Sequence, residues 1–145
     1  MTFIYAESHR ECVVCATPQH NRASLHLRFR AMPPQQVQAR FVAVAAYQGY
    51  QGVLHGGIAA TLLDAAMTQC LLMQDIEAMT ASLNIRYHYP IAVGTRLTVI
   101  GRQLAVTRGI YSMEAELVAN GRCYASALAK FMQPKVVKLV TEALQ

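Results

Sequence analysis

Charged side chains are scarce in this sequence. Asp, Glu, Lys and Arg make up 14% of the 145 residues and hydrophobic residues make up 54%, whereas a typical soluble domain is about 25% charged. So little charge indicates that a second subunit covers part of the apolar surface, and we expect a homo-oligomer. The length suits one compact core, so residues 1–145 are predicted to form a single domain.

Long apolar runs and targeting signals are also missing. The longest apolar stretch, Ile58 to Met73, includes Asp64 and falls short of the ~20 residues that a membrane-spanning helix needs. Met1 to Arg10 contains no apolar segment of the kind found in secretory signals. We therefore expect no membrane partner and a cytoplasmic location.

Basic residues outnumber acidic ones and give a net charge of +5, yet they are scattered and form no run or stripe. Nucleic-acid-binding surfaces typically combine such a stripe with aromatic side chains. The pattern therefore argues against nucleic acid as a partner. A diffuse positive field suits a small phosphorylated ligand instead.

Four cysteines occur in a chain without a secretory signal, and we predict that they are reduced thiols. Cys12 and Cys15, followed by His20, match part of a zinc-knuckle spacing, but no fourth ligand follows at a regular distance. Pro18 indicates a loop at the place where a redox CxxC pair would need a helix start. We predict no metal and no organic cofactor.

Hydrophobic periodicity predicts one long helix among antiparallel strands. Residues 1–23 are expected to be irregular, and Asn120-Gly121 is a strong signal for a tight hairpin. The expected strands are 25–30, 37–46, 81–89, 95–105, 110–119 and 122–132, the helix runs from Gly57 or Ile58 to about Gln74, and 135–145 is a tail or a short helix. This order indicates an α+β fold in which an antiparallel sheet wraps around one central helix.

The predicted helix is apolar around most of its circumference. Only Thr61, Asp64 and Thr68 share a polar sector when residues are placed about 100° apart. Such a helix has to be buried, so Asp64 should emerge from an enclosed element into a small polar slot. It then serves either as a general base or nucleophile, or as an ordinary polar residue hydrogen-bonded by Thr61 or Thr68.

Two glycines, Gly56 and Gly57, begin this helix directly after His55. Unpaired N–H groups in a first helical turn favour negative charge, so these amides suit the oxyanion of a tetrahedral intermediate. Asp64 lies on the order of 10 to 12 Å further along the axis, too far to act on the same carbonyl. We therefore predict that Asp64 and the Gly56 amide meet across a two-fold interface. His55 is either a general base or a residue that caps or orders the loop before the helix.

The run from Tyr47 to Asp64 resembles the signature of hotdog-fold acyl-CoA thioesterases of the phenylacetate-degradation type. The similarity extends over about residues 12–133 and includes Thr80–Tyr87 and the hairpin Asn120–Arg122. The resemblance implies a curved antiparallel sheet around one helix and subunits that join their sheets into dimers, which often pair into tetramers. It also implies active sites at the dimer interface.

The resemblance further implies roles for individual residues. Asp64 is the nucleophile or general base, and the Gly56 amide polarises the thioester carbonyl. His55 sets the loop that presents this amide. Thr80 falls where a family hydroxyl positions the attacking water or the aspartate.

One position departs from the family pattern, because some members have Asn where this chain has Gly49. Gln48 is the neighbouring side chain that would supply the amide instead. Gly57 is an expected substrate contact beside Gly56. Arg86 and Arg108 are the expected contacts to CoA phosphates, although as strand and turn residues they are equally suited to a solvated surface.

Hydrolysis of an acyl-CoA thioester to the free acid and CoA is the leading prediction. A thioester lacks strong resonance, so one carboxylate and one oxyanion donor suffice without a cofactor. The alternatives are a non-catalytic acyl-CoA binding protein and an acyl-thioester dehydratase or hydratase. The latter enzymes rest on a different, His-centred motif, and no residue pattern here identifies the acyl group.

Overall fold

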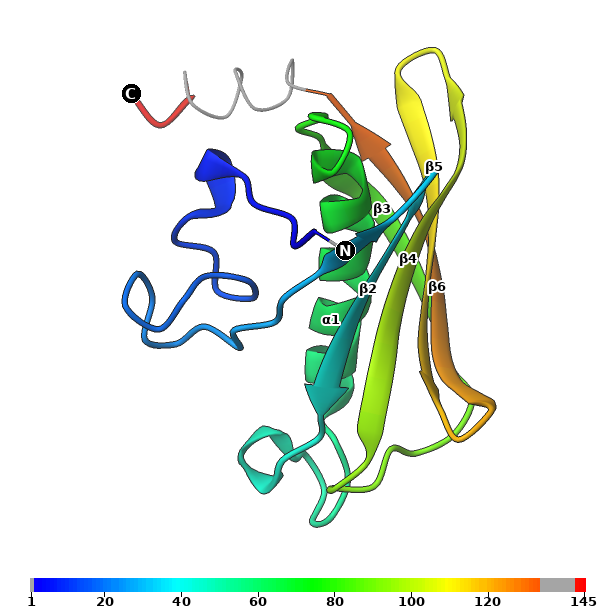
Figure 1. The fold of residues 1–145 in the computed structure, drawn as a ribbon. Coiled ribbons are helices and arrows are strands. Elements are labelled where there is room, and N and C mark those ends of the chain that lie inside the picture. Colours follow the sequence, from blue (N-terminus) through cyan, green and yellow to red (C-terminus); the bar gives the residue numbers. More distant parts are fainter. Residues whose placement is uncertain (1, 134–142) are drawn as a thin grey trace.

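The computed structural model describes residues 2–133 and 143–145 (Figure 1). The elements are β1 (Arg30–Met32), β2 (Gln36–Val42), α1 (Gly56–Leu72), β3 (Met79–Tyr87), β4 (Arg96–Thr107), β5 (Ile110–Ala119) and β6 (Arg122–Met132), with short 3-10 turns at Glu7–His9 and Ala45–Tyr47. The strands form one antiparallel sheet in the order β1-β2-β4-β5-β6-β3. Strand β3 is therefore an edge strand, next to β6 and far from β1.

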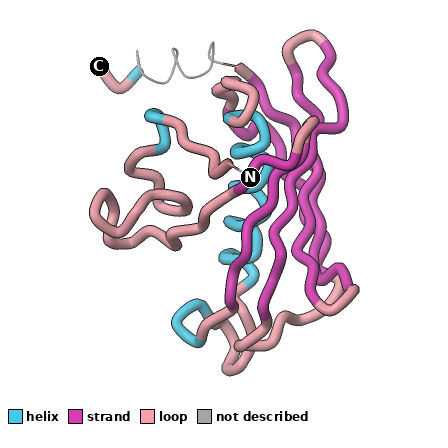
Figure 2. The backbone as a smooth tube through the Cα atoms, in the orientation of Figure 1, coloured by secondary structure: helices cyan, strands magenta, loops and turns pink. Residues whose placement is uncertain are grey.

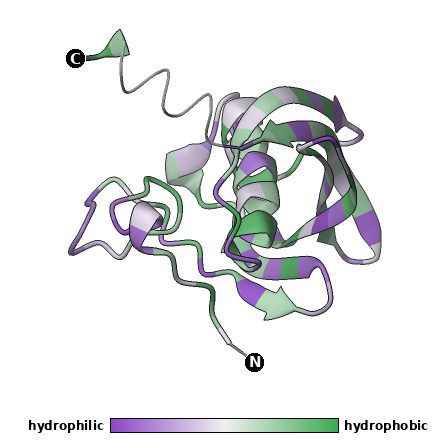
Figure 3. Ribbon diagram, turned by 90° about the horizontal axis from the view of Figure 1, so that it is seen from above, coloured by the Kyte–Doolittle hydropathy of each residue, from purple (hydrophilic) through white to green (hydrophobic). Residues whose placement is uncertain are grey.

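The sheet curves around α1, which confirms the predicted α+β architecture. Seen from above, the segment before β1 lies against the side of the helix that the sheet leaves open (Figure 3). A buried glutamine of α1 joins the two, because Gln69 Nε2 donates to Cys15 Sγ at 3.2 Å. Among the described residues, no helix is both long and apolar enough to cross a membrane.

Local sequence explains both ends of α1. His55 is the N-cap residue, and Ala, Leu and Met then favour the helical interior. At the other end Asp75 adopts a left-handed conformation, with φ of 58°. Asp75 N–H donates to Leu72 O and Ile76 N–H donates to Leu71 O, at 3.0 Å each. This pair of bonds is a Schellman motif, which satisfies the last helical carbonyls.

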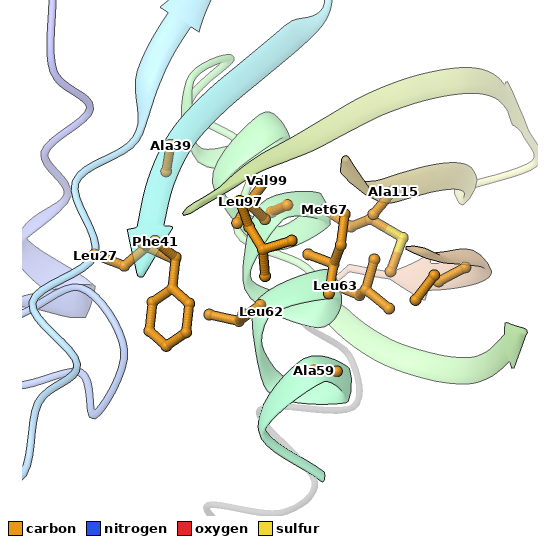
Figure 4. Close-up of a cluster of buried hydrophobic side chains, with 14 of the residues drawn as sticks. Leu27, Ala39, Phe41, Ala59, Leu62, Leu63, Met67, Leu97, Val99 and Ala115 are labelled. Carbon is orange, nitrogen blue, oxygen red and sulfur yellow. The ribbon is translucent and has the colours of Figure 1, made fainter. Parts of the chain in front are cut away.

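The core fills the space between the sheet and α1. Leu62, Leu63 and Met67 project from the helix and are fully buried. Figure 4 shows them packed against Leu97, Val99 and Ala115 of the sheet, with Phe41 of β2 at one side. Alternate residues of β2, β4, β5 and β6 point inward, as the period-2 pattern predicts.

Gly101 marks the closest approach of the sheet to the helix. A Cβ at this position of β4 would overlap the backbone carbonyl of Ala66 in α1. We expect Gly101→Ala to lower the free energy of unfolding by about 2 kcal/mol, because backbone rather than a flexible side chain would have to move. Denaturant unfolding of the variant measures this loss. A midpoint equal to that of the native chain would show that α1 and β4 separate without cost.

One predicted strand is wrong. Residues 25–29 are not part of the sheet, and β1 begins only at Arg30 (Figure 2). Leu25 and Leu27 instead donate backbone hydrogen bonds to Val13 and Val14, and His26 has φ of 53°, which interrupts an extended chain. The alternation still predicted the buried face, since Leu27 and Phe29 are buried.

The remaining boundaries differ less from prediction. Strand β2 ends at Val42 rather than at residue 46, because Ala45–Tyr47 turns the chain. The helix begins and ends slightly earlier than expected, and β3 begins and ends two residues earlier. Strand β4 begins one residue later and ends two residues later than expected, whereas β5 and β6 have the predicted bounds. Most of the predicted C-terminal tail, 135–142, lies outside the described residues.

Candidate active site

The first turn of α1 leaves one backbone N–H free. His55 satisfies the next three: its Nδ1 accepts from Gly57 N–H at 2.8 Å, and its carbonyl accepts from Ile58 and Ala59 at 3.0 and 3.1 Å. Among the described residues, Gly56 N–H has no acceptor. The free N–H at the positive end of the helix dipole is therefore that of Gly56.

His55 and Gly57 fit each other closely. A Cβ on Gly57 would lie 3.0 Å from the His55 ring, so glycine lets the ring fold over the helix start. Because the His55 ring accepts from Gly57 N–H, Gly56 N–H is the one amide of the predicted pair that is free in the described residues. His55 is thus in the capping position, the second of the two roles considered for it.

Asp64 lies on the helix face that looks toward β3. Thr80 Oγ1 donates to Asp64 Oδ1 at 2.6 Å, and the aspartate is half-buried. Neither helical threonine holds this carboxylate, since Thr61 donates to Gly57 O at 2.9 Å and Thr68 to Asp64 O at 3.1 Å. The carboxylate is therefore oriented from the sheet, which leaves its second oxygen available for another partner.

A β-bulge turns Thr80 toward the helix. Thr80 is opposite Phe131 in β6 and Ser82 is opposite Lys130, so Ala81 is an extra residue in β3. In a regular strand, Thr80 and Ser82 would lie two residues apart on the same, outward face. Phe131 is fully buried, which confirms that its partner faces the core side. Bulges commonly re-aim a side chain in this way beside active sites.

Tyr87 is a site residue to which the sequence assigned no role. Its hydroxyl donates to Gly56 O at 2.8 Å, so β3 fixes the helix start as well as the carboxylate. Leu83, Ile85 and Tyr87 alternate along β3 and share the face directed at α1. This alternation was the signal that would have placed Tyr87 beside the helix.

A hollow opens at the helix start. It measures about 410 Å³ and is lined by Gly49, Tyr50, Leu54, His55 and Gly56. Gln48 lies in the same loop, where its Oε1 accepts from Gly52 N–H at 3.0 Å. Within one chain the Gln48 side chain thus bonds to the backbone of its own loop, and no hydrogen bond links it to Asp64 in the described residues.

The structure does not bring the two predicted CoA-binding arginines to this hollow within one chain. Arg86 is exposed on β3 and pairs in register with Ser126, so it faces away from α1. Arg108 lies in the exposed turn between β4 and β5, at the end of the sheet opposite the start of α1 (Figure 1). Their contact with CoA phosphates stays a prediction.

The two N-terminal cysteines form a local pair. Val14 N–H donates to Cys12 Sγ at 3.3 Å, and a hydrogen bond from Cys15 holds the pKa of the Cys12 thiol below its ordinary value. The same contact raises the pKa of Cys15. Within residues 2–133 and 143–145, no three His, Cys, Asp or Glu side chains gather as a metal site.

Comparison with known proteins gives consistent matches. Residues 51–123 match the family model of the thioesterase superfamily. The mouse (Mus musculus) acyl-coenzyme A thioesterase THEM4 is 36% identical over 93 residues, which cover 59% of this chain and 38% of the mouse protein. This chain thus spans well under half of that relative.

Solved structures share the fold. A thioesterase superfamily protein superposes with a TM-score of 0.78 at 26% identity, over 86% of this chain and 61% of that one. The Escherichia coli PaaI protein of the phenylacetic acid degradation operon gives 0.71 at 18% identity, over 75% and 84% of the two chains. A hypothetical thioesterase of Streptococcus pneumoniae, solved with coenzyme A, gives 0.69 at 20% identity, over 74% and 87%.

These matches agree with the geometry described above, in which a curved six-stranded antiparallel sheet holds one long helix. The predicted hotdog fold is confirmed. The matched residues include the helix start with Gly56, and Asp64. The chain belongs to the thioesterase superfamily.

Proposed function

We propose that this protein hydrolyses an acyl-CoA thioester to the free acid and CoA, with Asp64 as the reacting carboxylate and Gly56 N–H as the oxyanion donor. The observation that carries the proposal is the hydrogen bonding of the first N–H groups of α1. His55 occupies the neighbouring amides and leaves Gly56 N–H free. Relatives named as acyl-CoA thioesterase or solved with coenzyme A support the substrate class.

The chemistry needs no group beyond these residues and water. As a general base, Asp64 removes a proton from water while the water oxygen attacks the thioester carbon. The carbonyl oxygen becomes an oxyanion that accepts from Gly56 N–H, and collapse expels the CoA thiolate, which takes up the proton. As a nucleophile, Asp64 attacks the thioester carbon and displaces the CoA thiolate, and water then cleaves the resulting anhydride to the free acid and the restored carboxylate, with the released proton passing to the thiolate. Thr80 fixes the carboxylate in either case.

We propose that each active centre combines two chains. Tyr87 and Thr80 lie near opposite ends of β3. Tyr87 contacts Gly56 and Thr80 contacts Asp64, so the oxyanion donor and the carboxylate of one chain lie beside opposite ends of this strand. Antiparallel pairing of β3 with its copy about a two-fold axis places opposite ends side by side. Asp64 of one protomer then lies next to the partner's Gly56.

The edge of β3 is suited to such pairing. Among the described residues it has β6 on one side and no strand on the other. Met79, Leu83 and Tyr87 are 44%, 39% and 55% exposed although two of them face the helix side. Long edges with apolar side chains normally require cover, and a second copy of β3 supplies it.

The direct test is a thiol-release assay of the native chain with short, medium, long and aromatic acyl-CoAs. Turnover with one or more of them is expected, and the preferred chain length identifies the acyl group. Absence of turnover together with saturable acyl-CoA binding would contradict hydrolysis and support a binding protein. Release of water from a 3-hydroxyacyl-CoA, detected as enoyl-CoA, would instead indicate a dehydratase.

A further inference from the structure

A basic cleft lies at the β1 end of the sheet. It measures about 360 Å³, and its walls include three arginines, Arg28, Arg30 and Arg40, with Phe3 and Met32 beside them. Nothing in the proposed hydrolysis uses these residues. The cleft is larger than a single hydrated ion and falls in the size range of small-molecule sites, about 300 to 1,000 Å³.

The cleft exists because the chain before β1 leaves the sheet. Strand β1 pairs with β2 only over Arg30–Met32, and the preceding Leu25 and Leu27 bond to Val13 and Val14 instead. In the described part of the chain, the β2 residues from Ala39 onward therefore pair with β4 on one side and with no strand on the β1 side. Arg28 and Arg40 line the cleft that this divergence leaves.

Register places the cleft away from the thioester centre. Arg30 is opposite Gln38, and Arg40 is opposite Thr98, whereas the intervening Ala39 is buried against the core. The arginines of β1 and β2 consequently occupy the face of the sheet turned away from α1. Asp64 and Gly56 instead contact β3 at the opposite edge.

The three guanidinium groups lack acidic partners. No carboxylate lies within ion-pair distance of any of them in the described residues, whereas Arg102 pairs with Glu114 and Glu116 at 3.0 and 3.2 Å. Arg28 and Arg30 both stack on the Phe3 ring, at 4.5 and 4.9 Å from its centroid. Stacking holds like charges together, and a bound multivalent anion would offset their repulsion.

We propose that this cleft binds an organic phosphate of the nucleoside di- or triphosphate class, at a site separate from the thioester centre. Guanidinium groups donate paired hydrogen bonds to phosphate oxygens, and three of them match a polyphosphate chain. Phe3 and Met32 provide an apolar wall for the base. A free nucleotide and the nucleotide end of CoA share this chemistry, so the experiment has to separate them.

The test is calorimetric titration of the full chain with ATP, with adenosine as the uncharged control ligand. ATP is expected to bind saturably and adenosine is not. In Arg28→Gln/Arg40→Gln the dissociation constant for ATP is expected to rise at least about tenfold, as expected for loss of charge-assisted bonds. The charge-matched control is Arg10→Gln/Arg22→Gln, whose residues do not line the cleft, and we expect less than about a twofold change there.

Three results would overturn the proposal. Absence of saturable ATP binding to the native chain would show that the cleft holds no nucleotide. Equal weakening in both double variants would assign the effect to the net charge of +5 rather than to the cleft. An equal loss of CoA affinity in Arg28→Gln/Arg40→Gln would make the cleft part of the CoA site. Thermal unfolding of each variant without ligand checks that the fold is intact.

Discussion

Asp64→Asn is expected to reduce kcat for acyl-CoA hydrolysis by about 1,000-fold, with a much smaller effect on KM. Asparagine has nearly the same shape, and its amide oxygen still accepts from Thr80 Oγ1, the contact measured at 2.6 Å in the native chain. The fold and the substrate site should therefore persist. What the variant loses is the basic or nucleophilic oxygen, and steady-state thiol release measures that loss.

Asp75→Asn is the matched control for this variant. Asp75 is the other aspartate of the chain, is exposed at the end of α1, and has φ of 58°, a conformation that asparagine tolerates. We expect native activity from it. If Asp64→Asn also kept native turnover, Asp64 would have no part in the reaction.

Gly56→Pro is expected to lower kcat by roughly 100-fold to 1,000-fold, because proline has no N–H to donate to the oxyanion. The local backbone accepts proline. Gly56 is the first residue of the helix, where proline is favoured, and His55 before it is extended, with φ of −61° and ψ of 132°. The change therefore removes the donor without breaking α1, which circular dichroism verifies.

Gly56→Ala separates the amide from the loss of glycine. A Cβ at Gly56 would lie 3.7 Å from the Tyr87 ring, which is ordinary contact, and the N–H is retained. Alanine should keep most of the activity that proline removes. Equal losses in both variants would mean that space beside Tyr87 matters, rather than the amide.

The fold was predictable where local signals decide it. The run of helix formers after the His55 cap predicted α1, and Asn120-Gly121 predicted the hairpin between β5 and β6. The segment around Leu27 shows the limit of such signals. The alternation identified which side chains are buried, but not the hydrogen-bond partners of the backbone. Those partners are Val13 and Val14, which lie in the N-terminal segment outside the sheet.

The candidate site was predictable as a set of residues but not as an arrangement. Spacing along α1 indicated that Gly56 and Asp64 cannot serve one carbonyl in one chain. No pattern revealed the bulge at Ala81 that turns Thr80 inward, since a bulge depends on the register with β6. The resemblance pointed to the Gly56 amide, but the hydrogen bond that occupies Gly57 N–H depends on which way the His55 ring points, and no sequence pattern revealed it.

The proposed two-chain active centre makes a direct prediction for mixed oligomers. Gly56→Pro and Asp64→Asn chains are each expected to be nearly inactive, and a mixed dimer would contain one centre with both defects and one with neither. Random reassortment of equal amounts makes about half of the dimers mixed, so about one quarter of the native specific activity should return.

Activity after unfolding and refolding the two variants together, compared with each refolded alone, is therefore the decisive measurement. The two-chain centre predicts recovery to about one quarter of native turnover. Activity that stays at the average of the two separate variants would contradict it, because every centre would then draw Gly56 and Asp64 from the same chain.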